Sequence, residues 1–209
     1  MLNLMTDTKT HWQNIYSQKQ ANSVTWFQSN PDTSLGLIKN SQIAKNAPIL
    51  DVGSGASLLI DSLLNKGFTE LSVLDISSSA LAASKQRLGS LAEKITWYEA
   101  DITQFVPETE YSLWHDRAVF HFLTDKADRK KYIDCLKSAL KVNGHVIIAT
   151  FALDGPKKCS GLEVVHYDVS KMSSELGDDF TFVEVILEKH ITPLKNVQKF
   201  IYFHFIKNK

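Results

Sequence analysis

Two glycines and three aspartates have the types and the spacing needed to bind a ligand that carries a ribose. Asp51, Gly53 and Gly55 end a short apolar run. Glycines at alternate positions let the backbone turn tightly and let a ligand approach the main chain. Asp75 ends the next apolar run about 20 residues later, where a carboxylate can accept two hydrogen bonds from a ribose diol. Asp101 follows the third run, so all three acids are expected at one edge of a sheet.

The elements that position these residues alternate along the chain. Apolar runs predict strands at 49–52, 71–75, 95–99, 111–115 and 145–151. Helical spacing predicts helices at 58–66, 77–91, 128–140 and 170–176. This alternation implies an α/β fold with a doubly wound, Rossmann-like, seven-stranded and mostly parallel sheet. Two further apolar runs, 180–188 and 200–207, have no long helix between them, so an antiparallel C-terminal strand pair is expected.

Asp75, the pair Asn143-Gly144 and the loop at 153–161 each add a local expectation. Asp75 can instead cap the helix predicted at 77–91, although Ser77 or the serine after it can also do so. Asn143 and Gly144 predict a turn before the strand at 145–151. The loop at 153–161 is rich in Gly, Pro, Lys and Ser, and we expect it to lie over a cleft.

The first 45 residues precede the alternation and are expected to form a helical cap on a single domain that spans 1–209. Trp12 and Tyr16 lie at helical spacing, and a second helix is expected to follow Pro31 and to end before Pro48. The aromatic residues here, which include Trp26, either dock these helices against the sheet or belong to a lid that closes over the ligand.

Composition excludes several functional classes. Lysine plus arginine number 23 and aspartate plus glutamate number 23, a balance that argues against a nucleic-acid partner and against an electrostatic membrane anchor. No apolar run approaches the ~20 residues that span a bilayer, and no signal peptide is evident, so a cytoplasmic location is expected. Cys135 and Cys159 form no disulfide framework and have no metal-ligand spacing with histidines.

In this order, the motifs resemble those of class I S-adenosylmethionine-dependent methyltransferases, and the chain is similar to small bacterial-type members with type 11/12 methyltransferase domains. The resemblance covers residues 45–207 and includes the antiparallel strand pair. It implies S-adenosyl-L-methionine as the cofactor, with Asp75 on the ribose and Asp101 and Ile102 at the adenine. The cofactor-binding residues that it implies are Asp51, Gly53, Ser54, Gly55, Asp75, Ile76, Asp101, Ile102 and Asp116.

Two other classes of function compete with this interpretation. The dinucleotide-binding motif of a nicotinamide-dependent reductase requires a third glycine at position 58, where this chain has Leu58. Such a reductase also requires a second half-sheet, for which the sequence shows no strands of the needed length. A non-catalytic protein that binds the same cofactor is the other alternative, and the intact glycines and acids argue against it. Ser57 departs from the third glycine of many family members, at a position where the family varies.

The acceptor side is expected to be built from the segment after 111–115, the segment after 145–151 and the N-terminal aromatic residues. Methyl transfer is an in-line displacement that needs an aligned, deprotonated nucleophile and no metal. His121 is the first candidate for a base, because imidazole titrates near neutral pH, although it can equally pack against the core. The other catalytic candidates are His115 and Tyr16, and the substrate-facing candidates are Arg117, Phe120, Tyr167 and Trp26. Arg117 can hold an anionic substrate or pair with Asp116.

The acceptor itself is left open by two conflicting resemblances. The Trp-x-x-x-Tyr helix followed by Val-Thr-Trp-Phe at 24–27 is similar to protein-lysine methyltransferases of translation factors. The segment Asp116-Arg117-Ala118 is similar to the Asp-Arg-Gly of thiopurine-type enzymes, which act on small thiols. Balanced charge and a short chain slightly favour a small molecule, with a protein lysine as the alternative. The sequence does not predict the oligomeric state.

Overall fold

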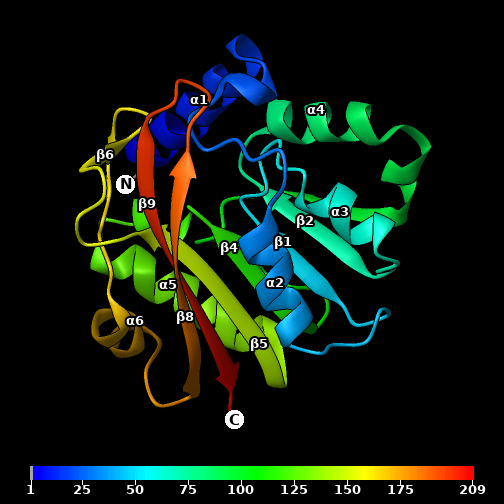
Figure 1. Ribbon diagram of the computed structural model, residues 1–209, viewed down its shortest axis with the longest axis vertical. Coiled ribbons are helices and arrows are strands. Elements are labelled where there is room, and N and C mark those ends of the chain that lie inside the picture. Colours follow the sequence, from blue (N-terminus) through cyan, green and yellow to red (C-terminus); the bar gives the residue numbers. More distant parts are fainter. Residues whose placement is uncertain (1) are drawn as a thin grey trace.

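The computed structural model describes residues 2–209, except the side chains of residues 2–7 and Ala21. Within them, the apolar runs form one twisted sheet with the strand order β3-β2-β1-β4-β5-β9-β8 (Figure 1). The strands are β1 Ile49–Val52, β2 Leu71–Asp75, β3 Ile95–Glu99, β4 Tyr111–Arg117, β5 Leu140–Phe151, β8 Phe180–Ile191 and β9 Val197–Lys207. Strands β1 to β5 pair in parallel, and β9 pairs antiparallel with both β5 and β8. The predicted fold class is confirmed.

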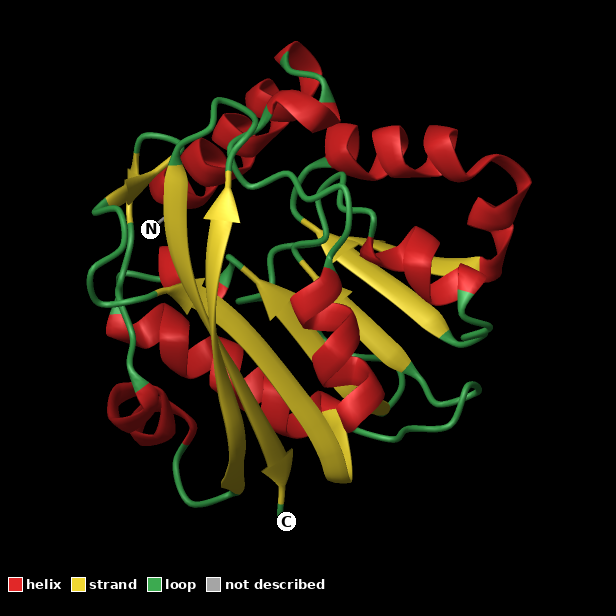
Figure 2. Cartoon of the chain, viewed as in Figure 1, coloured by secondary structure: helices red, strands yellow, loops and turns green. Residues whose placement is uncertain are grey.

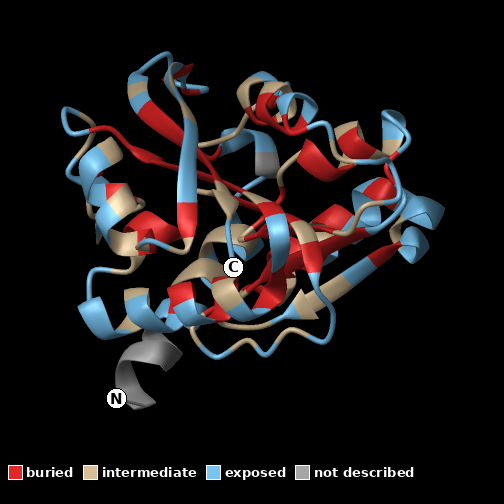
Figure 3. Cartoon of the chain, turned by 90° about the horizontal axis from the view of Figure 1, so that it is seen from below, coloured by how far each residue is buried: buried red, intermediate tan, exposed pale blue. Residues whose placement is uncertain are grey.

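Helices cover both faces of the sheet and one of its ends (Figure 2). The faces are covered by α2 Asp32–Asn40, α3 Leu59–Asn65 and α4 Ser78–Leu88 on one side and by α5 Lys126–Ala139 and α6 Val169–Leu176 on the other. Helix α1, Leu2–Gln18, lies above the carboxyl ends of the parallel strands. The face between strands and helices is apolar on both sides, so the sheet is the most deeply buried layer (Figure 3).

Helix α4 shows how local residues set an element's ends. Its start is capped by Ser77, whose hydroxyl accepts a hydrogen bond from Ala80 N at 3.2 Å. The helix was predicted to continue to 91, but it ends at Leu88 because Gly89 takes a φ of +57°. Residues Gly89–Lys94 then form a 3-10 turn that leads into β3.

Strand β4 is longer than predicted at its carboxyl end, which is near the cavity. Strand β5 is longer than predicted at its amino end, which is far from the cavity. β4 continues to Arg117, and the chain then turns at Ala118 with a φ of +75°. β5 begins at Leu140, because the turn predicted at Asn143 is accommodated as an irregularity within the strand. The predicted loop at 153–161 contains one strand of a small hairpin, β6 Lys158–Cys159 with β7 Leu162–Glu163. None of the helices between residues 2 and 209 has the length and apolar character needed to span a bilayer.

Candidate active site

A cavity of about 460 Å³ lies at the carboxyl ends of the parallel strands, beneath α1 and the segment 24–34. The candidate site residues that line it are Tyr16, Trp26, Asp51, Gly53, Ser54, Asp75, Ile76, Asp101, Ile102, His115 and Arg117. Strand register explains this grouping, because Asp51 on β1 pairs with Val73 on β2 and with His115 on β4. Side chains from three neighbouring strands therefore meet at one edge.

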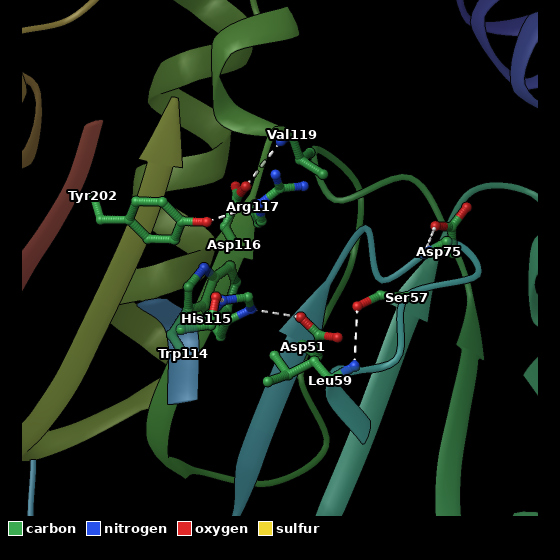
Figure 4. Close-up of polar contacts among 12 residues, drawn as sticks. Asp51, Ser57, Leu59, Asp75, Trp114, His115, Asp116, Arg117, Val119 and Tyr202 are labelled. Atoms are coloured by element: carbon green, nitrogen blue, oxygen red, sulfur yellow. Dashed lines mark hydrogen bonds and ion pairs between the residues drawn. The ribbon is translucent and has the colours of Figure 1, made fainter. Parts of the chain in front are cut away.

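The centre of this edge is a chain of hydrogen bonds through His115. Its Nδ1 lies 2.7 Å from Asp51 Oδ1, and its Nε2 lies 2.9 Å from the hydroxyl of Ser34 on α2. Figure 4 shows Asp51 and His115 pointing towards each other from adjacent strands. Since a carboxylate can only accept, His115 Nδ1 carries the proton. Asp51 Oδ2 is buried and has no hydrogen-bond partner among the described residues, so it is free to accept from a ligand.

Asp75 faces both the cavity and the start of α4. Its Oδ1 accepts a hydrogen bond from Ser77 N at 2.8 Å, and its Oδ2 accepts one from Gly55 N at 2.7 Å. The carboxylate also lines the cavity. Burial is the main reason that the pKa of Asp75 rises to about 6, although its two backbone hydrogen bonds oppose the rise.

The glycine turn is shaped by two neighbours that touch it. Gly53 and Gly55 have φ angles of +60° and +56°, a region that side chains with a Cβ rarely adopt. A Cβ at position 53 would overlap Val119 Cγ2, and one at position 55 would overlap the Tyr16 hydroxyl. Gly55 therefore does not line the cavity directly, because Tyr16 on α1 covers it.

Besides Gly55, four of the predicted site residues do not line the cavity, and for all five the expectation of direct contact is corrected. The four are Asp116, Phe120, His121 and Tyr167, all fully buried. For Phe120 and His121 the cause is the 3-10 turn Phe120–Phe122, which turns its first two side chains into the core and Phe122 into the cavity. Tyr167 packs against Phe120, with centroids 5.3 Å apart. Asp116 caps this turn by accepting from Val119 N at 2.8 Å and from Phe120 N at 3.0 Å.

His121 has the wrong environment for a base. Burial lowers the pKa of His121 to about 3, so its ring is neutral at pH 7. Its Nδ1 accepts a long hydrogen bond from Phe151 N, at 3.3 Å. The ring packs against Phe122 and Phe151, with centroids 4.5 and 4.9 Å away. His121 is therefore a core residue, the alternative that the sequence left open.

A substitution separates the two histidines. We expect His121→Leu to keep label transfer from methyl-labelled cofactor to lysate within about twofold of wild type, since the ring touches only core residues. We expect His115→Leu to reduce the same transfer by more than tenfold, because the change removes the donor that holds Asp51. The measurement is label incorporated per unit time between pH 6 and pH 9. A tenfold loss in His121→Leu, with unchanged melting temperature, would contradict this assignment.

Arg117 does not pair with Asp116, which was one of the two possibilities that the sequence left open. Its Nε donates to Tyr202 Oη at 2.8 Å, and its Nη1 donates to the carbonyl of Trp26 at 2.9 Å. Its Nη2 lies 3.8 Å from Glu188 Oε2, in a pair whose side chains are 11% and 15% exposed. Figure 4 shows Arg117 directed at Tyr202. Strand β1, which carries Asp51, is one neighbour of β4, and Tyr202 on β9 lies beyond the other neighbour, β5. The charge of Arg117 is therefore balanced within the protein.

Four aromatic rings form one wall of the cavity. Trp12 is central, with its centroid 5.7 Å from Trp26, 6.5 Å from Tyr16 and 5.0 Å from Phe122. Trp26 Nε1 also donates to the Tyr16 hydroxyl at 3.3 Å. Burial keeps the pKa of Tyr16 well above its usual value, so the phenol stays protonated.

Several important residues were missed by sequence reasoning. Gln13 on α1 accepts from the hydroxyls of Ser77 and Ser78 and thereby holds α1 against the start of α4. Glu188 lies in β8 and bonds the segment after α1 from 155 to 160 positions away. Neither residue belongs to a local motif, so no sequence signal pointed to them. Cys159 also lines the cavity, and burial raises the pKa of its thiol to about 12.

Among known proteins, the chain matches a methyltransferase family model and solved methyltransferase structures. A family model described as a methyltransferase domain matches residues 50–146. N-methyltransferase NodS from Bradyrhizobium japonicum, solved with S-adenosylhomocysteine, superimposes with a TM-score of 0.68 at 17% identity, over 95% of this chain and all of that one. Residues 50–146 thus match a methyltransferase domain, and the chain has the fold of class I S-adenosylmethionine-dependent methyltransferases. S-adenosylmethionine is its cofactor, and the expected enzyme class is confirmed.

Other relatives of this methyltransferase differ in their acceptors. EEF1A lysine methyltransferase 2 of Homo sapiens is 25% identical over 68% of the chain and 67% of its own length, and that of Danio rerio is 26% identical over 68% of each. The 1,6-didemethyltoxoflavin-N1-methyltransferase of Burkholderia thailandensis has a TM-score of 0.69 at 17% identity, over 99% of this chain and 88% of that one. At such identities the structural likeness shows the fold alone.

Proposed function

We propose that this methyltransferase acts on an amine nitrogen and that its acceptor is a lysine side chain of a protein. The charge of the cavity carries the proposal. Among the described residues that line it, the aspartates are Asp51, Asp75, Asp101, Asp125 and Asp128, and the guanidinium of Arg117 is already paired with Glu188. Such a cavity favours cationic ligands, and both a sulfonium and an ammonium group are cations.

The aromatic wall supports an ammonium acceptor in a second way. The rings of Trp12, Tyr16, Trp26 and Phe122 line the cavity together. A cation over an aromatic face gains ~0.5–2 kcal/mol, and tryptophan is the strongest partner. Apolar rings also desolvate the ammonium, which lowers its pKa, so that it releases a proton to solvent and the neutral amine is the nucleophile. An acceptor with a carboxylate would gain from neither effect.

The residues at the cavity fit the cofactor. Asp51 Oδ2 is buried without a partner, and the turn at Gly53 brings the main chain to the cavity wall. In our proposal Asp75 holds the ribose, Ile102 and Asp101 hold the adenine, and Asp51 holds the methionine amino group. When bound, S-adenosylmethionine supplies an electrophilic methyl group on sulfur.

The protein's own residues then align the acceptor and exclude water. The aromatic wall and the segment 24–34 confine the approach of the nitrogen, which an in-line displacement requires. The protonated Tyr16 hydroxyl can donate a hydrogen bond but cannot remove a proton at neutral pH. His115 acts on Asp51 rather than on the acceptor, because its two ring nitrogens are engaged by Asp51 and Ser34.

The relatives favour lysine over a small amine. The curated relatives named above are lysine methyltransferases, and they share sequence over two thirds of the chain. A small-molecule amine is the second candidate, because α1 and the segment 24–34 cover the cavity and the structural neighbours include a methyltransferase of a small heterocycle. The slight preference for a small molecule drawn from composition is therefore reversed in this proposal.

One labelling experiment tests the acceptor. The enzyme is incubated with methyl-labelled cofactor and a cell lysate divided into protein and small-molecule fractions. We expect label in a protein band, released as methylated lysine on acid hydrolysis. A matched lysate whose lysines have been blocked by succinylation should take up at least tenfold less label. Label that is confined to the small-molecule fraction would reject lysine, and label on oxygen or sulfur would reject an amine altogether.

A further inference from the structure

We propose that Glu188 is a positioning residue for methyl transfer, and that it acts by holding the segment 24–34 as the acceptor-side wall of the cavity. This inference rests on the proposed function only where it concerns the acceptor. Glu188 lies in β8, far along the chain from any residue of the cofactor turn. It is not among the residues that line the cavity, so its effect on a bound ligand is expected to be indirect.

Glu188 collects hydrogen bonds from the segment 24–34. Gln28 Nε2 donates to its two carboxylate oxygens at 3.1 and 3.2 Å. Thr33 Oγ1 donates to Oε1 at 2.8 Å. One carboxylate thus fixes two side chains that lie five positions apart, which defines the path of the chain between them.

The same carboxylate fixes the main chain of the segment through a relay. Tyr202 donates to Glu188 Oε2 at 2.9 Å and accepts from Arg117 Nε at 2.8 Å. Arg117 in turn donates through Nη1 to the carbonyl of Trp26 at 2.9 Å. His190, two residues after Glu188 on β8, holds the neighbouring carbonyl of Thr25 at 2.8 Å. Side chains from β4, β8 and β9 therefore anchor residues 25–33 to the rigid sheet.

The position of the segment 24–34 matters because this segment forms part of the cavity lining. It supplies Val24, Trp26, Phe27, Gln28, Pro31 and Ser34 to the cavity lining. Trp26 belongs to the aromatic wall, and its indole touches Trp12 and bonds Tyr16. A shift of Trp26 by about 1 Å would misplace the wall on which we expect the acceptor to lie, and such shifts can cost about 100-fold in rate.

The cofactor side of the cavity is held by other residues. Asp75 is fixed by Gly55 and Ser77, and Asp51 is fixed by His115. None of these contacts involves Glu188, and Ser34, which lies 2.9 Å from His115 Nε2, is itself part of helix α2. Loosening the part of the segment that precedes α2 should therefore leave the cofactor site largely intact. We therefore expect a looser segment 24–34 to weaken binding on the acceptor side and to leave cofactor binding largely unchanged.

The first test is Glu188→Gln, with Glu184→Gln as its matched control. Glu184 lies on the same strand and accepts from Asn40 of α2, outside the segment 24–34. In Glu188→Gln we expect amide hydrogen exchange across residues 24–34 to quicken by about tenfold or more, while affinity for S-adenosylhomocysteine stays within about threefold. Glu184→Gln should change neither. Unchanged exchange in Glu188→Gln would overturn the proposal.

A second pair of variants separates positioning from simple stability. Glu188→Gln leaves the Arg117 cation buried without its partner, so it can destabilise the whole fold. The double variant Arg117→Met with Glu188→Leu removes both charges, and we expect it to recover the melting temperature but not the slow exchange at 24–34. If the double variant recovered both the melting temperature and the slow exchange at 24–34, Glu188 would have a structural role only. Should the single variant fail to fold, Tyr202→Phe breaks the relay alone and should also quicken exchange at 24–34.

The acceptor side is probed by calorimetric titration with tetramethylammonium in the presence of S-adenosylhomocysteine. We expect wild-type protein and Glu184→Gln to bind this cation alike, and Glu188→Gln to bind it about tenfold more weakly. Equal binding by all three proteins would overturn the positioning role at the acceptor wall. Absence of binding to wild-type protein would instead count against the amine acceptor proposed above, and the exchange measurement would still decide the role of Glu188.

Discussion

The substitution Asp75→Asn is expected to weaken S-adenosylhomocysteine binding by about 100-fold while changing the free energy of unfolding at pH 7 by less than about 1 kcal/mol. A carboxylate can accept from both hydroxyls of a ribose, whereas an amide offers one acceptor oxygen. Stability responds to two opposing effects. The amide relieves a buried charge, but its NH2 group then faces Gly55 N or Ser77 N, which each donate to the carboxylate now.

The pH dependence of the wild-type protein provides an independent check of Asp75. Its pKa is raised to about 6 in the folded protein, so the carboxylate becomes protonated below that pH and loses acceptor capacity. Affinity for S-adenosylhomocysteine should therefore fall as pH decreases from 7 to 5. Folding responds in the opposite direction, because a raised acid pKa makes this group's contribution to stability larger below pH 3.8 and smaller as pH rises through 6.

Calorimetry at several pH values measures both effects. The matched control is Asp134→Asn, an exposed aspartate on α5 that pairs with Lys130. It should bind S-adenosylhomocysteine like the wild type at every pH. If Asp75→Asn also bound normally, Asp75 would be a helix cap only and the ribose would lie elsewhere.

The gathering of three aspartates at one cavity was predictable because it follows from the positions of strand ends. Asp51, Asp75 and Asp101 each follow a short apolar run, and parallel strands place their carboxyl ends at one edge. Only the order of the runs and the period of the pattern were needed. The sheet could be predicted for the same reason, since each crossover helix forces its flanking strands to be parallel.

The acceptor side could not be predicted, because it depends on turns and on contacts between distant segments. Phe120, His121 and Phe122 are adjacent, and only the 3-10 turn determines that the third side chain reaches the cavity. Arg117 was assigned a neighbour in sequence as its partner, whereas its partner is Glu188, on the far edge strand. Pairing across a sheet edge leaves no periodic signal in the sequence.

These two halves also differ in their electrostatics. The cofactor side holds carboxylates whose charge is only partly neutralised, as the unpartnered Asp51 Oδ2 shows. The acceptor side holds one buried cation, Arg117, whose Nε and Nη1 donate to Tyr202 and to a main-chain carbonyl, and whose Nη2 has an ion pair with Glu188 at 3.8 Å but no hydrogen bond among the described residues. Buried charges are costly unless they are paired, so the unpaired ones are the residues expected to meet a cationic ligand.

The second large effect is expected for Gly53→Ala, which should reduce both cofactor affinity and methyl transfer by about 100-fold. The new Cβ would overlap Val119 Cγ2. Val119 cannot easily yield, because its amide is held by Asp116, which also bonds Phe120 N and Tyr132. The glycine turn must therefore move, and this turn forms part of the cavity wall on which we propose that the cofactor lies. Binding of S-adenosylhomocysteine by calorimetry and label transfer measure the two losses.

Two further variants attribute this effect to the overlap rather than to the backbone angle. Gly89 has a φ of +57°, close to the +60° of Gly53, but a Cβ there would meet nothing within 4 Å. Because the ψ of Gly89 is −130°, it lies outside the left-handed helical region. Gly89→Ala should therefore lose about 1–3 kcal/mol of stability from backbone strain, and should bind cofactor normally. In the double variant Gly53→Ala with Val119→Ala, the overlapping methyl group is gone and Val119 Cβ lies 3.3 Å from the new Cβ, so most of the affinity should return. If the double variant bound no better than Gly53→Ala, the loss would come from the strained φ, and the contact between Val119 and the glycine turn would not shape the cofactor site.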